Sequence, residues 1–267
     1  MPGGMQFVHQ RVPAEGHHLP ATQYSGRLPA NWMSSAREMA PSSYLCILCG
    51  AELFQTDTVA ACSFCGQETR AEYLCPNGHH VCEDCQLANP VQAIERICAG
   101  NRETDPGVIV NLVLKHPAMV MHGPAHHVLV APAILAALSN SGQRPLKPGR
   151  LASAIERTSD IPFAVCGTRG ECGAAVSVGA LVSLLTGASY LKDRERALAL
   201  QATAEALQAI ADGGGPRCCK QSVYLALETA VAFLRYELDL NLPLTIRCEF
   251  SGRNEECKKE RCQYYDG

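Results

Sequence analysis

Residues 44–85 read YLCILCGAELFQTDTVAACSFCGQETRAEYLCPNGHHVCEDC. Seven cysteines and two adjacent histidines fall within this segment as four short motifs. The motifs are Cys46-x2-Cys49, Cys62-x2-Cys65, Cys75-x3-His79 (or x4-His80) and Cys82-x2-Cys85. A C-x2-C pair suits a tight turn that directs two thiolates at one ion. With one of the two histidines, the segment offers eight ligands, the number that two tetrahedral zinc ions need.

The simplest pairing joins neighbouring motifs, because each set of four ligands is then contiguous in the sequence. One zinc ion would be bound by Cys46, Cys49, Cys62 and Cys65, and the other by Cys75, His79, Cys82 and Cys85. His80 remains an alternative to His79. Disulfides or scattered core thiols would explain the paired spacing and the interleaved histidine less well. Sites saturated in this way are structural and leave no open position for a substrate, so the function has to be sought elsewhere.

Composition restricts the class of protein. The chain has 267 residues, enough for a small metal-stapled module and one larger domain. A net charge of −3 and a pI near 6.3 argue against general binding to nucleic acid or to a membrane surface. No apolar run approaches a membrane span, and the N-terminus has no apolar signal-peptide core. Fifteen cysteines without a secretion signal indicate a reducing cytoplasm, where thiols bind metals or react.

Breaks in composition divide the chain into four parts. We expect a disordered tail over 1–43, a zinc-ribbon-like module over 44–88, a linker helix over 89–100 and a Cys-rich helical domain over 101–267. Apolar periodicity predicts helices over 91–99, 124–138, 147–156, 172–185, 193–211 and 220–235. Pro132 should kink the second of these or begin a new helix. The fold class is therefore mainly α, a helical bundle preceded by a small module that binds two zinc ions.

Two Gly-rich loops in the helical domain carry the remaining chemistry. They read Cys166-Gly-Thr-Arg-Gly-Glu-Cys172 and Gly213-Gly-Gly-Pro-Arg-Cys218-Cys219-Lys220, and each leads into a helix. A cysteine in the first turn of a helix meets free N–H groups and the positive end of the macrodipole, which favour a thiolate or an anionic ligand. Arg169, Arg217 and Lys220 add positive charge in the same places. We therefore expect the two loops to meet in space.

Four thiols held in this way suit a [4Fe–4S] cluster or a reactive thiolate pair. Adjacent residues point in different directions on a helix, so only one of Cys218 and Cys219 should join Cys166 and Cys172. Three ligands would leave one iron open for a small anionic substrate. Two further groups add to this site: His126 and His127 are candidate general bases, with helix-cap hydrogen bonds as the alternative. The terminal Cys248-x8-Cys257-x4-Cys262 would bind a further metal or supply a cluster ligand.

A resemblance covers the same stretch. The His126-His127 segment, Cys166-Gly-x4-Cys172-Gly-Ala-Ala, Gly-Gly-Pro-Arg-Cys-Cys-Lys and the terminal cysteines resemble a Cys-rich domain of unknown function from anaerobic bacteria and archaea. Residues 160–235 are also similar to the iron–sulfur L-serine dehydratase and L-cysteine desulfidase group, which implies a cluster whose open iron acts as a Lewis acid. The Cys-Cys-Lys sequence departs from that group, in which the two cysteines are more widely spaced.

The sequence therefore favours an iron–sulfur-dependent protein of anaerobic metabolism, with non-redox activation of a small anionic substrate or sulfur handling as its role. A non-enzymatic adapter or metallochaperone is the alternative, in which the zinc module would dock on a partner metalloenzyme. A zinc-ribbon protein linked to transcription or RNA is a third reading, and the acidic charge balance argues against it.

Overall fold

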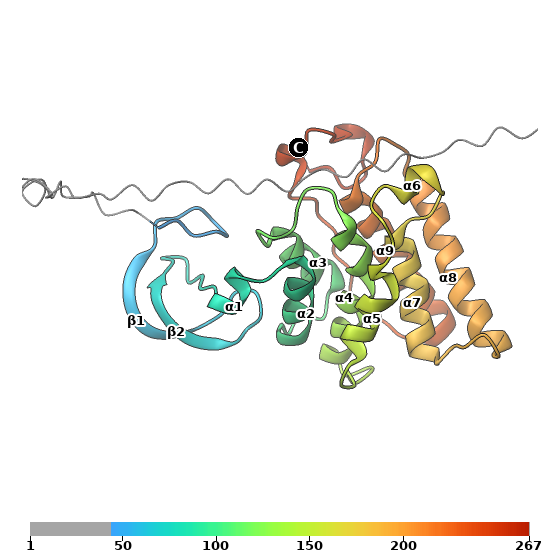
Figure 1. The fold of residues 1–267 in the computed structure, drawn as a ribbon, viewed down its shortest axis with the longest axis horizontal. Helices are drawn as coiled ribbons and strands as arrows, with labels where there is room; N and C mark the ends of the chain where they lie inside the picture. Colours follow the sequence, from blue (N-terminus) through green and yellow to red (C-terminus); the bar gives the residue numbers. More distant parts are fainter. Residues whose placement is uncertain (1–43, 267) are drawn as a thin grey trace, which may run out of the picture. The chain divides into compact units, whose positions relative to one another are not determined.

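The computed structural model describes residues 44–266, so the tail expected over 1–43 lies outside the described residues. Within this range the chain is mainly helical, with nine α-helices and a single two-stranded sheet (Figure 1). This confirms the predicted fold class. None of the described helices is both long and apolar enough to cross a bilayer.

The metal-binding module is built around one β-hairpin. Strands β1 (Phe54–Ala61) and β2 (Glu68–Leu74) pair antiparallel, with Phe54 opposite Leu74 at one end and Ala61 opposite Glu68 at the other. Most of the strand residues are exposed, so the hairpin buries little apolar surface of its own. Two-stranded hairpins are marginal in water, and this one therefore depends on the cysteine motifs at its ends. A short helix, α1 (Glu83–Gln86), follows the hairpin.

The remaining helices form the larger part of the structure. They are α2 (Pro90–Gly100), α3 (Pro106–Lys115), the 3-10 helix η1 (Pro124–Val128), α4 (Val130–Asn140), α5 (Arg150–Ser159), α6 (Val165–Thr168), α7 (Gly173–Thr186), α8 (Asp193–Asp212) and α9 (Cys219–Leu238). The helix expected over 124–138 is split into η1 and α4. Pro132 lies in the first turn of α4, where a missing N–H costs nothing, so it is compatible with a second helix start.

Helix α7 occupies the centre of the bundle. It contacts η1, α4, α5, α8 and α9, and Val178, Leu181 and Val182 on it are completely buried. Gly179 lets α8 approach closely, because a Cβ there would lie 2.0 Å from Thr203 Oγ1. The almost wholly apolar composition of this helix follows from its having neighbours on most sides.

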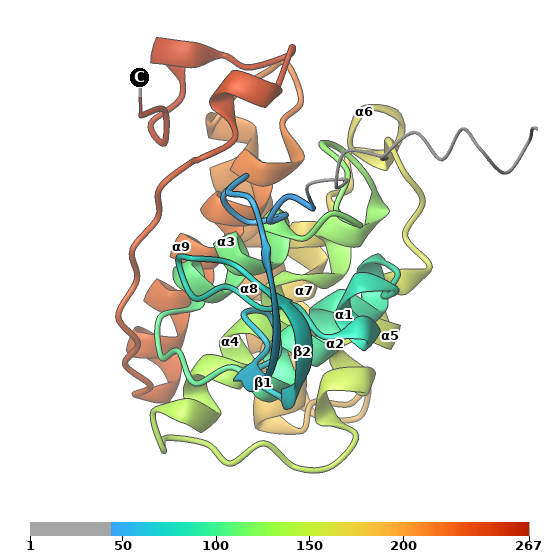
Figure 2. The same ribbon diagram turned by 90° about the vertical axis from the view of Figure 1, so that its left-hand side faces the viewer.

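The chain returns along the bundle after α9. That helix has 20 residues and is about 30 Å long. Beyond it, Asn111 Nδ2 of α3 donates to the Arg247 carbonyl at 2.8 Å, and Tyr264 packs edge-on against Tyr224 of α9. The red segment in Figure 2 follows this path, and short 3-10 helices η2 (Ser251–Arg253) and η3 (Lys259–Arg261) complete it. The last three cysteines are thereby carried back to the N-terminal end of α9.

Candidate metal centres

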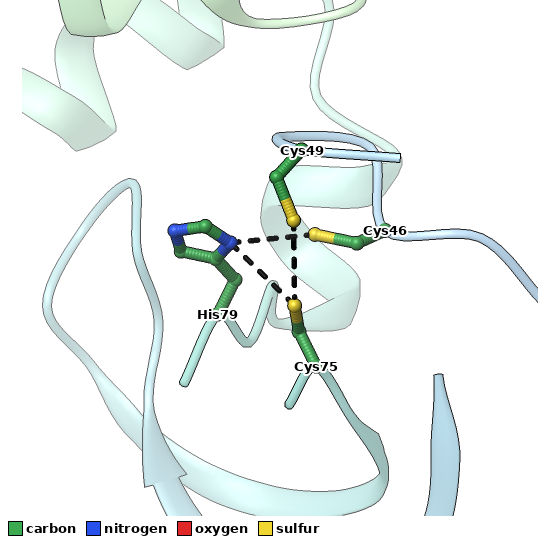
Figure 3. A group of neighbouring side chains, drawn as sticks. All are labelled: Cys46, Cys49, Cys75 and His79. Atoms are coloured by element: carbon green, nitrogen blue, oxygen red, sulfur yellow. Dashed lines mark hydrogen bonds between the residues drawn. The ribbon is translucent and has the colours of Figure 1, made fainter. Parts of the chain in front are cut away.

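Two four-residue groups in the module bring all their ligand atoms within 4.8 Å of one another. The first tetrad consists of Cys46, Cys49, Cys75 and His79 (Figure 3). The second tetrad consists of Cys62, Cys65, Cys82 and Cys85. The expected pairing of neighbouring motifs is therefore wrong: the four motifs interleave, the first with the third and the second with the fourth.

The hairpin explains the interleaving. Antiparallel pairing sets Phe54, just after the first motif, opposite Leu74, just before the third. The second motif lies in the turn at the other end of the strands. An eight-residue strand spans roughly 25 Å, so two motifs at opposite ends of β1 cannot share one ion. Motifs that are neighbours in the sequence lie at opposite ends of the strand, so the length of the strand decides which motifs meet.

The first tetrad has the dimensions of a tetrahedral metal site. Cys49 Sγ lies 3.5 Å from Cys75 Sγ, and His79 Nδ1 lies 3.5 Å from Cys46 Sγ and 3.7 Å from Cys75 Sγ. Metal–sulfur bonds of about 2.3 Å and metal–nitrogen bonds of about 2.0 Å place tetrahedral ligands roughly 3.6–3.8 Å apart. His80 points elsewhere, with its Nε2 at 2.8 Å from Thr69 Oγ1. His79 is the histidine of the tetrad.

The second tetrad is buried and joins the module to the helices. Cys85 is fully buried, and its carbonyl oxygen accepts a 2.7 Å hydrogen bond from His116 Nε2 of the chain after α3. Burial raises the pKa of the Cys85 thiol. A buried thiol of this kind ionises readily only beside a cation. Gly100, the last residue of α2, approaches so closely that a Cβ on it would lie 1.8 Å from the Cys65 carbonyl oxygen.

The two Gly-rich loops meet, as expected, at a separate pocket in the helical domain. This thiol pocket brings together Cys166 of α6, Cys172 at the N-cap of α7 and Cys219 at the start of α9. His126, His127 and Arg217 also line it. Gly173 is required here, because a Cβ on it would lie 2.3 Å from the His127 ring.

Two polar atoms of the thiol pocket are buried without a partner among residues 44–266. His126 is fully buried, its Nδ1 lies 3.0 Å from the Gly123 carbonyl, and its Nε2 has no hydrogen-bond partner. Burial, aided by the charge of Lys220, lowers the pKa of His126 to about 3, so the ring is neutral and Nε2 carries a free lone pair. Arg217 Nε is also unpartnered, although its guanidinium stacks on Phe163. Orphaned buried groups of this kind indicate a ligand.

The thiols of the pocket are held differently from one another. Cys166 is exposed, whereas Cys172 and Cys219 are buried. Burial raises the pKa of Cys172, and the amides of Ala174 and Ala175 in the first turn of α7 oppose this rise. Burial likewise raises the pKa of Cys219, which the Gly123 amide and the charge of Arg217 oppose. Only at Cys172 do amides of its own helix oppose the rise, and burial still raises the pKa of both thiols.

Two residues expected in this site, Arg169 and Lys220, lie outside it, and of the two adjacent cysteines only Cys219 lines it. Arg169 is exposed and lies 3.9 Å from Glu171. Lys220 is buried but points away from the thiol pocket, and its Nζ donates to the Met121 carbonyl at 2.9 Å. Cys218 faces a second pocket, the four-cysteine pocket, which it lines with the three C-terminal cysteines Cys248, Cys257 and Cys262.

Sequence reasoning missed two residues of the four-cysteine pocket. Lys258 is only 6% exposed, and Asn254 is buried with its Nδ2 3.7 Å from Cys218 Sγ. Both occur in a charged, polar segment, NEECKKE, which has the composition of a solvated loop. The only available signal was that one cysteine, Cys257, interrupts this segment, with Cys248 and Cys262 on either side of it.

Comparison with known proteins supports a family but no activity. No curated protein and no solved structure matches the chain, so the likeness to the L-serine dehydratase and L-cysteine desulfidase group has no support. Residues 94–265, well over half of the chain, match a family of unknown function, DUF5714. The matched range contains every residue of the thiol pocket and of the four-cysteine pocket, and it begins after the zinc-ribbon-like module. The chain therefore belongs to the family of unknown function DUF5714.

Proposed function

We propose that this protein is a metal-dependent protein of a reducing, oxygen-poor cytoplasm, with two zinc ions in its N-terminal module and an iron–sulfur cluster in the thiol pocket. In this proposal the cluster serves a small anionic substrate by non-redox activation or sulfur handling. The observation that carries it is the convergence of Cys166, Cys172 and Cys219 on two unpartnered buried groups, His126 Nε2 and Arg217 Nε. All fifteen cysteines are free thiols, in keeping with a reducing compartment.

The donor chemistry of the tetrads favours zinc. One tetrad offers three sulfurs and a nitrogen and the other four sulfurs, which are combinations typical of structural zinc. The ligand separations in the first tetrad agree with tetrahedral zinc bonds to within a few tenths of an ångström. Closed sites of this type stabilise the fold and do not bind substrate. We therefore assign zinc a structural role in the module.

The thiol pocket offers three cysteines as ligands for the proposed cluster. Cys166, Cys172 and Cys219 would hold it, and such a cluster supplies a Lewis-acidic iron with an open position. Arg217, whose guanidinium also lies 3.7 Å from the Glu256 carboxylate, would bind an anionic group of the substrate. His126 Nε2 is placed to accept a hydrogen bond from the substrate, because the ring is neutral and its other nitrogen is engaged with the Gly123 carbonyl. Phe163 also lines the pocket, and the Arg217 guanidinium lies 4.7 Å from the centre of its ring.

Anaerobic purification followed by iron, sulfide and zinc analysis tests the proposal. We expect zinc at two ions per chain, together with iron and acid-labile sulfide. The Cys172→Ala and Cys219→Ala variants should lose iron from the thiol pocket and keep both zinc ions. Arg217→Ala should keep the iron but weaken the spectral change produced by a small molecule with a carboxylate group, such as L-serine or L-cysteine. Cys98→Ala, a change at a buried cysteine outside both pockets, is the control.

One observation favours the adapter role as a second candidate. Large apolar side chains are exposed on the module, including Tyr44, Leu45, Ile47, Phe54 and Tyr73, and the rings of Tyr44 and Tyr73 pack at 4.7 Å. An exposed apolar cluster of this kind is typical of a protein-docking surface. A protein that contains zinc alone after anaerobic purification and reconstitution would contradict the iron–sulfur proposal and favour this adapter.

A further inference from the structure

The four-cysteine pocket gathers every cysteine of the C-terminal segment around one residue of α9. Cys218 is the N-cap of α9, and Cys248, Cys257 and Cys262 come from the segment that returns along the bundle. The pocket is partly open to solvent, and all four cysteines line it.

The spread of the sulfur atoms argues against a single metal ion. Both tetrads bring four ligand atoms within 4.8 Å of one another, as one tetrahedral ion requires. Among the described residues, no three of the sulfurs in the four-cysteine pocket meet that limit. A cubane of four irons and four sulfides holds its thiolates further apart than one ion does, because each thiolate binds a different iron. A cluster, rather than one ion, is therefore the metal group that four thiolates lining one pocket without meeting that limit would hold.

Hydrogen bonds to sulfur support ligation by these cysteines. Asn254 Nδ2 donates to Cys218 Sγ at 3.7 Å, and Lys259 N donates to Cys257 Sγ at 3.4 Å. The second contact, from the amide two residues further on, also occurs at Cys75 of the first tetrad, where Asn77 N lies 3.4 Å from Sγ. Amides aimed at cysteine sulfur stabilise thiolates and tune metal–sulfur sites.

Two buried lysines give the pocket positive charge that no carboxylate among residues 44–266 is paired with. Lys220 is 2% exposed and Lys258 is 6% exposed, and both line the pocket. Lys220 donates to one carbonyl, Met121 O, and Lys258 donates to the carbonyls of Gly213 and Gly214. Within residues 44–266 neither lysine forms an ion pair with a carboxylate. Two buried cations without counter-charges are costly, and an anionic cluster beside them would supply the missing charge.

We infer that Cys218, Cys248, Cys257 and Cys262 are the four ligands of a [4Fe–4S] cluster whose negative charge is balanced by Lys220 and Lys258. This cluster would be closed, because every iron has a protein ligand, so it would not itself bind substrate. It would be joined to the thiol pocket by a single peptide bond, since Cys218 and Cys219 are adjacent and face different pockets. The inference does not depend on the function proposed for the thiol pocket.

Paired variants of the full-length chain separate the two sites. Each protein is purified anaerobically, reconstituted with ferrous iron and sulfide, and analysed for iron, acid-labile sulfide and zinc. The double variant Cys257→Ala/Cys262→Ala should lose about four irons per chain relative to the unmodified protein. The matched double variant Cys166→Ala/Cys172→Ala should retain that cluster. Cys98→Ala is again the control, and an unchanged zinc content and helical circular dichroism show that a variant is folded.

The outcomes distinguish the proposals. Iron that survives in Cys257→Ala/Cys262→Ala but is lost in Cys166→Ala/Cys172→Ala would overturn this inference and leave the thiol-pocket proposal standing. The opposite pattern would uphold the inference and overturn the thiol-pocket cluster. A third zinc ion per chain in place of iron, or no iron in any sample, would also overturn it.

A second measurement does not depend on removing a ligand. Lys258→Met keeps the length of the side chain and removes its charge, so the reduced, more negative cluster should become harder to form. We expect a more negative midpoint potential in a dithionite titration followed by electron paramagnetic resonance, and restoration towards the original value in Lys258→Arg. An unchanged potential in Lys258→Met would contradict the placement of the cluster beside this lysine.

Discussion

The contact between Gly100 and the second tetrad provides the sharpest test of how the module is attached. A Cβ at position 100 would lie 1.8 Å from the Cys65 carbonyl oxygen and 2.8 Å from its carbonyl carbon, whereas real Cβ contacts essentially never fall below 3.0 Å. In Gly100→Ala the end of α2 and Cys65 must therefore separate from 1.8 Å to at least 3.0 Å, a displacement of about 1.2 Å. The opposing atoms are backbone atoms, which cannot rotate away.

That displacement is large for a metal ligand. Metal–ligand distances tolerate deviations of roughly 0.2 Å, so a shift of this size at Cys65 should release the ion of the second tetrad. Overpacking alone destabilises proteins by about 1–3 kcal/mol. At about 2–4 °C per kcal/mol for a chain of this size, the melting temperature should fall by roughly 2–12 °C, before any further loss from the metal.

Zinc analysis and thermal unfolding of the purified variant measure both effects. We expect Gly100→Ala to contain one zinc ion per chain in place of two and to melt at a lower temperature. Ala99→Ser, at an exposed position of the same helix, should match the unmodified protein in both measurements. Two zinc ions and an unchanged melting temperature in Gly100→Ala would refute the close contact between α2 and the second tetrad.

Three further predictions follow from individual side chains. Cys49→Ser and Cys85→Ser should each remove one zinc ion. Cys85→Ser should lower the melting temperature more, because Cys85 is fully buried against the helices and Cys49 is exposed. Equal decreases in melting temperature would contradict this reasoning. Gly173→Ala should displace His127 and so reduce the iron retained after reconstitution. Chemical unfolding should show a destabilisation of about 1–3 kcal/mol, which alanine at a helical glycine without close neighbours should not cause. Cys98 is 2% exposed and burial raises its pKa to about 12, so iodoacetamide should label it at pH 8 only after denaturation. Cys98→Ala should lower the free energy of unfolding by on the order of 1 kcal/mol.

The identities of the module's ligands could be predicted from the sequence because they are set locally. A C-x2-C turn aims its two thiolates at one point whatever the rest of the chain does. The glycine after Cys49 is an example: Gly50 adopts a φ of 73°, and its amide donates to the Cys46 carbonyl at 2.8 Å. Helices were likewise predictable, because apolar periodicity reflects which face of each helix is buried. The sequence did not decide whether residues 124–138 form one helix or two, because Pro132 could either kink a single helix or begin a second one.

The partners of each motif were decided by tertiary structure. The antiparallel hairpin separates the first two motifs by the length of β1, and no local property of a C-x2-C turn records that distance. The pockets that Cys218 and Cys219 line were likewise decided by tertiary structure. The sequence indicated that adjacent residues at a helix start diverge, but the return of residues 239–262 along α9 placed three thiols beside Cys218 and left Cys219 with Cys166 and Cys172. Long-range packing determines such encounters, because residues remote in sequence meet only where the whole chain buries its apolar faces.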